Sequence, residues 1–165
     1  MSAARRRYFA YGANIIRSEM AERCPAARAL GVATLAGWRF AIGAAGYGTI
    51  LRDRKASVVG LLWSLTPACE AALDEFEAVV GRDLYRKETL EVTGEPALVY
   101  VASDPRPGRP QPGYLEPIVA AAEELGFPAD YVEASLRTWL RQHYFGRFSL
   151  RAPFSGFPRA ILRDS

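Results

Sequence analysis

The feature that most constrains the fold is a short aromatic run near the N-terminus that ends at a glycine. The segment from Tyr8 to Tyr11 is apolar and aromatic, which is typical of a buried strand. Gly12 follows it, and Asn14 is a residue type that often caps a helix. Apolar residues then continue at helical spacing to Met20. We therefore predict a strand, a glycine turn and the beginning of a helix.

This predicted junction has two interpretations. Several backbone N–H groups are exposed where a turn enters a helix, and such groups favour a carboxylate or a developing oxyanion. The same pattern also occurs in ordinary β-turn-α connections that bind nothing. The junction alone does not choose between them.

Along the rest of the chain, strand patterns dominate the first hundred residues and helix patterns the remainder. The predicted strands cover 29–42, in two runs broken around Gly37, and then 49–51, 58–65, 84–92 and 98–102; residues 52–55 are predicted to be a charged turn. The predicted helices cover 67–80, 114–125 and 129–142, and the four prolines within 104–113 predict a loop. This order indicates the α+β class. With six or seven strands, we expect a small mixed β-barrel flanked by helices.

Length and charge indicate one domain of modest charge. The 165 residues suit a domain spanning 1–142 followed by an aromatic, basic tail at 143–165. The net charge is +3, yet the tail region from Arg137 onward carries six arginines against one acid, Asp164. Basic residues among aromatics can bind nucleic acid, but such a tail more often packs on its own domain or on a second subunit. We therefore expect a possible homodimer and consider nucleic-acid binding the weaker alternative.

Few residues are available for metal or disulfide chemistry. Cys24 and Cys69 lie 45 residues apart without metal-like spacing, so we expect buried free thiols. His143 is the single histidine, which excludes a multi-histidine metal centre. No stretch has the length and apolarity of a membrane span, and no signal-peptide pattern follows the N-terminal arginines. We expect a cytoplasmic protein without a metal ion.

One carboxylate stands out in the helix that begins at Pro67. Its apolar face contains Leu73 and Phe76, and Glu77 lies about 60° from the centre of that face at ~100° per residue. The helix's other acids lie further toward solvent. Burial raises the pKa of a carboxyl group, so that it can accept a proton and later return it. The alternative is a surface salt bridge of Glu77 with Arg82 or Lys87.

Several segments together resemble the γ-glutamylcyclotransferase-like (AIG2-like) family. The run from Tyr8 to Asn14 is similar to the family's opening strand and Tyr-Gly-Ser-Asn loop, and Val59–Trp63 is similar to its central strand. Leu73–Glu77 resembles the segment that carries the catalytic glutamate, and Tyr85–Leu90 resembles the strand that follows. Tyr114 lies where a substrate-contacting tyrosine is expected.

The resemblance implies an acyl transfer that needs no cofactor. The α-amine of a γ-glutamyl compound attacks its own γ-carbonyl, which gives 5-oxoproline and releases an amino acid or amine. Glu77 would act as general acid and base, while Tyr11, Gly12, Ala13, Asn14 and Tyr114 would bind the substrate.

The sequence departs from the family pattern at two positions. Ala13 replaces the loop serine, and Ala78 replaces a glycine that often follows the glutamate. Neither change removes an ionisable group, so we expect altered substrate choice and not lost activity. A non-catalytic small-molecule binding domain on the same fold is the main alternative. The sequence does not decide whether the substrate is glutathione, a γ-glutamyl dipeptide or a γ-glutamyl amine. The leaving group is therefore open.

Overall fold

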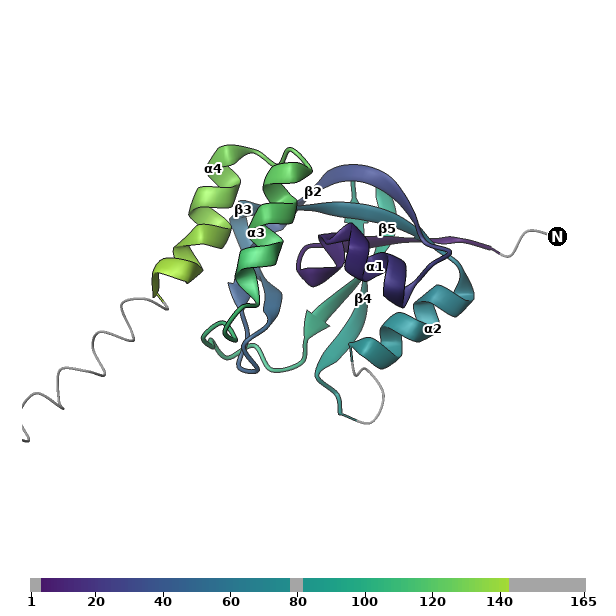
Figure 1. Cartoon of the computed structure of the whole chain (residues 1–165), viewed down its shortest axis with the longest axis horizontal. Coiled ribbons are helices and arrows are strands. Elements are labelled where there is room, and N and C mark those ends of the chain that lie inside the picture. Colours follow the sequence, from purple (N-terminus) through teal and green to yellow (C-terminus); the bar gives the residue numbers. More distant parts are fainter. Residues whose placement is uncertain (1–3, 78–81, 143–165) are drawn as a thin grey trace, which may run out of the picture.

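A five-stranded mixed sheet with helices beside it forms the fold (Figure 1). The computed structural model describes residues 4–77 and 82–142. Within them, the strand order is β2-β3-β1-β5-β4. The strands are β1 (Arg6–Ala10), β2 (Arg28–Ile42), β3 (Gly48–Leu65), β4 (Tyr85–Val92) and β5 (Glu95–Ala102). The helices are η1 (Ala13–Ile15), α1 (Arg17–Arg23), α2 (Pro67–Phe76), α3 (Leu115–Glu124), α4 (Ala129–Tyr131) and the π-helical η2 (Val132–Arg137).

The predicted α+β class is confirmed. The described strands form a mixed sheet, which is not shown to close into the predicted barrel. β1 pairs with β3 in the antiparallel direction and with β5 in the parallel direction, so the sheet is mixed. The hydrogen-bonded order of the described strands begins at β2 and ends at β4. The described residues contain five strands and not six or seven, because two pairs of predicted segments merge into the long strands β2 and β3.

Two predicted interruptions are absent from the long β2–β3 hairpin. Gly37 does not end β2; it lies at a bulge with φ of 83°, where the register with β3 shifts and the strand continues. The charged segment from Arg52 to Lys55 belongs to β3 and is not a turn. Its side chains are exposed or half-buried, so the strand holds four charges without burying them. The Arg52 guanidinium also lies 4.5 Å from the centre of the Trp38 ring on β2.

The helix boundaries follow the predicted signals, with one exception. Thr66 caps α2, because its Oγ1 accepts a hydrogen bond from the Cys69 backbone N–H at 3.2 Å. The loop from 104 to 113 contains no helix or strand, and Gly126 follows α3 with φ of 77°. α2 ends at Phe76, earlier than the predicted Val80, and Glu77 is its C-cap. The predicted stop at Gly81 lies outside the described residues, as do Ala78, His143 and the tail at 143–165.

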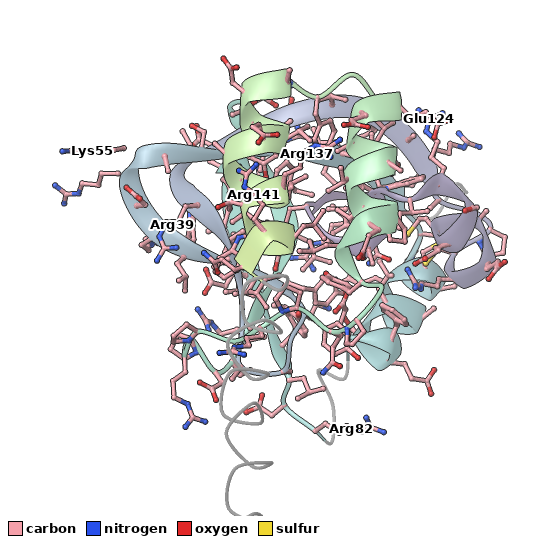
Figure 2. All side chains as sticks on the ribbon, turned by 60° about the vertical axis from the view of Figure 1, so that its left-hand side comes forward. Arg39, Lys55, Arg82, Glu124, Arg137 and Arg141 are labelled. Carbon is pink, nitrogen blue, oxygen red and sulfur yellow. The ribbon has the colours of Figure 1, made fainter. Side chains whose placement is uncertain are left out.

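The helices lie in two groups around the sheet (Figure 1). α3 and α4 lie side by side near β2 and β3, whereas α1 and α2 lie toward the other end of the sheet. Arg137 and Arg141 lie on the helix that continues from α4, away from Arg39 and Lys55 on the hairpin (Figure 2). No helix among the described residues is long and apolar enough to cross a membrane.

The core fills the space between the sheet and the helices. Fully buried side chains come from β1, β3, β5, α2 and α3, among them Phe9, Leu61 and Leu73. Gly60 allows β3 to pack closely on β1, because a Cβ at this position would lie 2.3 Å from the Ala10 carbonyl oxygen. Both cysteines are buried and free, as predicted.

Candidate functional site

A cavity of about 400 Å³ lies where six segments of the chain meet. The first segment runs from the end of β1 through η1 and α1. The others are the β2–β3 turn, the end of α2, the beginning of β4, β5 and the beginning of α3. All six residues predicted from the sequence as site residues line it: Tyr11, Gly12, Ala13, Asn14, Glu77 and Tyr114. The fold therefore brings together residues that are up to a hundred positions apart.

Glu77 supplies a carboxyl group to the inner part of this cavity. It lies at the C-terminal end of α2 and is partly buried. Burial raises the pKa of its carboxyl group from 4.5 to about 7, although the charge of Arg23 and a hydrogen bond from Asn14 oppose the rise. A carboxyl with this pKa exchanges its proton near neutral pH. That property is what a group acting alternately as base and acid requires.

The alternative salt bridge of Glu77 is not formed among the described residues. Lys87 instead pairs with Glu70 at 2.5 Å and with Asp74 at 3.0 Å. These two acids therefore face the sheet, not solvent as predicted, because β4 passes beside α2. Arg82 lines the cavity but makes no ion pair within the described part of the chain, and Figure 2 shows it extending away from the ribbon.

Asn14 belongs to the site through its side chain and does not cap a helix. It lies inside η1, which begins after Gly12, and Ile16 is the N-cap of α1. The Asn14 Nδ2 group donates to the Tyr8 hydroxyl at 2.9 Å and to Glu77 Oε1 at 3.2 Å. Its backbone carbonyl oxygen accepts a hydrogen bond from Trp63 Nε1 at 3.0 Å. The short η1 turn thus aims this amide at Glu77.

Arg23, at the end of α1, fixes the orientation of that amide. Its guanidinium donates to Asn14 Oδ1 at 2.7 Å and to Glu19 Oε2 at 2.8 Å. It also lies 3.8 Å from the centre of the Phe76 ring. Because Asn14 Oδ1 faces this cation, the Asn14 Nδ2 group must face Glu77 and Tyr8.

Within the described residues, five of the six tyrosine hydroxyls on the cavity wall form hydrogen bonds, and these five fall into two groups. Those of Tyr11, Tyr85 and Tyr100 donate their protons to the Tyr100 carbonyl oxygen, the Gly48 carbonyl oxygen and Asp74 Oδ1, respectively. The hydroxyls of Tyr8 and Tyr114 instead accept hydrogen bonds, and no acceptor for their own protons is found among the described residues. Tyr8 and Tyr114 can therefore donate to a ligand.

Tyr114 is held in a corner formed by two glycines. Its hydroxyl oxygen accepts from the Gly48 backbone N–H at 3.0 Å. A Cβ at Gly12 or Gly48 would lie 3.0 or 2.9 Å from that oxygen, so larger residues would displace it. Burial raises the pKa of Tyr114 to about 12, with backbone N–H groups of Gly48 and Ala13 opposing the rise. The phenol is neutral and serves as a proton-bearing donor.

The cavity wall also contains residues that were not predicted as site residues, among them Tyr8, Arg23, Gly48 and Tyr85. The spacing of Glu19 and Arg23 on a helix is a weak signal of an ion pair, which the structure contains at 2.8 Å. Tyr85 gave no local signal, because its hydrogen-bond partner Gly48 lies 37 residues away.

Comparison with known proteins identifies the class to which this fold and cavity belong. The model of the AIG2-like family matches residues 57–134. A solved structure of gamma-glutamyl cyclotransferase superposes with a TM-score of 0.72 at 26% identity, over 79% of this chain and 85% of that one. An uncharacterized protein from Homo sapiens superposes with a TM-score of 0.71 at 26% identity, over 78% and 85%.

A third structure supports the fold alone. YkqA from Bacillus subtilis superposes with a TM-score of 0.66 at 21% identity, over 86% of this chain and 55% of that one. The chain has no significant match among curated protein sequences. The family-model match and the two structures at 26% identity confirm the resemblance to the AIG2-like, gamma-glutamyl cyclotransferase-like family that the sequence segments predicted.

Proposed function

We propose that this protein is a γ-glutamyl cyclotransferase-type enzyme that releases 5-oxoproline from a γ-glutamyl substrate. The substrate's α-amine forms a bond to its own γ-carbonyl carbon, and the bond from that carbon to the leaving nitrogen breaks. The attacking ammonium loses two protons as it becomes the lactam N–H, and the leaving amide nitrogen gains two as it becomes an ammonium group, so a carboxyl group that alternately accepts and returns a proton can serve both transfers. The nucleophile is tethered to its target, which makes its effective molarity high without a cofactor.

The observation that carries this proposal is the Glu77 carboxyl group in the cavity. Its raised pKa of about 7 suits transfer of a proton from an ammonium and return of it to an amine. Asn14 Nδ2 holds Oε1 at 3.2 Å, which leaves the other carboxyl oxygen for the substrate. The match of residues 57–134 to the AIG2-like family model and the likeness to gamma-glutamyl cyclotransferase support the same role for this glutamate.

Binding of the glutamyl group would use donors on the cavity wall near Glu77. The backbone from Gly12 to Asn14 enters η1, and its N–H groups can receive the glutamyl carboxylate or the oxyanion. The hydroxyl protons of Tyr8 and Tyr114 add two side-chain donors to this set. Tyr11 packs in the same wall, with its hydroxyl engaged by Tyr100. Ala13 contributes only backbone groups.

The test is release of 5-oxoproline from γ-glutamyl dipeptides, γ-glutamyl amines and glutathione. Wild type should release it from at least one of them, and Glu77→Gln should lose at least 100-fold in kcat/KM while keeping its fold. Glu75→Gln is the matched control, because Glu75 is an exposed acid on the same helix. It should keep wild-type activity.

Two results would contradict the proposal. Substantial turnover by Glu77→Gln would remove Glu77 from the mechanism. Absence of 5-oxoproline from every compound, together with measurable binding, would indicate the non-catalytic binding domain instead.

A further inference from the structure

The entrance to the Glu77 cavity carries an apolar rim. Among the described residues, five large apolar side chains are exposed, and three of them, Tyr47, Phe76 and Leu84, line this cavity. Their exposed fractions are 43%, 48% and 39%. The other two, Leu30 and Val32, lie on the edge strand β2. Exposed apolar side chains gathered at a cavity commonly mark a binding surface.

The rim side chains are exposed but held in place. The Arg23 guanidinium covers one face of the Phe76 ring at 3.8 Å. Tyr47 packs edge-on against Tyr114, with the ring centres 5.3 Å apart. The backbone of Leu84 is fixed by a hydrogen bond from the Ser103 N–H to its carbonyl oxygen at 3.0 Å. A preordered apolar wall gains contact with a ligand at little entropic cost.

The charges of the cavity wall disfavour a cationic ligand at the rim. Apart from Glu77, the acid on the described wall is Glu19, which pairs with Arg23 at 2.8 Å. Arg82 adds a positive charge to the same wall. A cationic side chain at the rim would therefore lose water without gaining a carboxylate partner.

From this rim we infer that the leaving part of the substrate is an amino acid or amine with an apolar side chain. This inference rests on the proposed function, because the glutamyl group would occupy the inner wall beside Glu77. The leaving nitrogen would then lie at Glu77, and the group attached to it would extend toward Phe76, Leu84 and Tyr47. These three residues determine which γ-glutamyl compounds are accepted.

The experiment compares γ-glutamyl-norleucine with γ-glutamyl-lysine. The two leaving side chains have nearly the same length, but the second carries an ammonium group. We expect kcat/KM for the norleucine compound to be at least tenfold higher. Phe76→Ser and Leu84→Ser should each reduce this ratio severalfold, mainly by slowing turnover of the norleucine compound.

Leu30→Ser is the matched control, because Leu30 is 54% exposed and lies outside the cavity. It should leave the ratio unchanged. If Phe76→Ser fails to fold, Leu84→Ser alone still tests the rim. Equal kcat/KM for the two compounds would overturn the inference and leave the proposed function intact.

A wild type that turns over neither of these two compounds nor any other γ-glutamyl compound tested for 5-oxoproline release would contradict the proposed function and not the rim by itself. Calorimetric titration of both compounds into the wild type would then test the rim separately. Tighter binding of γ-glutamyl-norleucine would support it. Equal binding, or no binding of either compound, would overturn it.

Discussion

At the residue scale, the Glu77 carboxyl group carries a cost in stability. Its pKa is raised from 4.5 to about 7 because folding removes it from water. The folded protein therefore holds this proton more tightly than the unfolded chain does. The stability that the folded state gains from holding this proton is complete below pH 4.5 and is lost as the pH rises through 7. The free energy of unfolding changes by at most about 3 kcal/mol over this range.

Replacement of this carboxyl group should make that cost measurable. Glu77→Gln cannot ionise, so we expect it to be more stable than wild type at pH 8.5, by up to about 3 kcal/mol. At pH 5 the excess should be smaller, because wild-type Glu77 is then protonated. Urea unfolding of both proteins at the two pH values checks this. A difference that is the same at both pH values would contradict the raised pKa.

Arg23 acts on the same carboxyl group through its charge and through Asn14. Its positive charge lowers the pKa of Glu77, and its hydrogen bond to Asn14 Oδ1 orients the amide that contacts Oε1. Arg23→Gln should therefore raise the pKa of Glu77 and shift the rising limb of the pH–rate profile to higher pH. Arg23→Lys, which keeps the charge, should shift it less. An unchanged limb in Arg23→Gln would exclude this coupling.

At the element scale, helix α2 sets the position of Glu77. Thr66 begins the helix with a side-chain hydrogen bond to the Cys69 N–H at 3.2 Å, and Glu77 ends it. Thr66→Ala should cost about 1 kcal/mol of stability, because one N–H of the first turn loses its partner. Thr66→Ser keeps the hydroxyl and should lose much less. Equal losses in urea unfolding would assign the effect to packing of the Thr66 methyl group instead.

At the scale of the whole molecule, the backbone of Gly48 connects three separate segments of the chain. Its N–H donates to Tyr114 at the beginning of α3, and its carbonyl oxygen accepts from Tyr85 on β4. These two hydrogen bonds hold the β2–β3 turn against both α3 and β4 in the cavity wall. The wall depends on contacts across the entire fold.

The two tyrosines should differ in their effect on activity. Tyr114→Phe removes a hydroxyl whose proton is available to a substrate. We therefore expect kcat/KM to fall by about 100-fold, the lower end of the loss seen when an oxyanion donor is removed. Tyr85→Phe removes a hydroxyl already engaged by Gly48, and we expect only a severalfold loss. Steady-state kinetics on one γ-glutamyl substrate compares them. A larger loss in Tyr85→Phe would contradict this division.

Local sequence patterns determined much of the framework. The aromatic strand before Gly12, the Thr66-Pro67 helix start and the proline-rich loop were all predictable, because each depends on sterics and hydrogen bonds within a few residues. Helical spacing also placed Glu77 near the apolar face of α2, and its partial burial confirms this. The residue types of the predicted site are therefore present in the sequence and gather in one cavity.

Only the tertiary structure decided which partners these residues have. Asn14 is a residue type that often caps a helix, yet its side chain contacts Glu77, which lies 63 residues away. Lys87 pairs with Glu70 and Asp74 and leaves Glu77 to the cavity, because β4 passes beside α2. Likewise, Arg52 at the start of the charged segment pairs with Trp38 on β2, and β3 continues through this segment to Leu65. Such choices depend on segments distant in sequence, whereas the sequence by itself determined the local elements that bring them together.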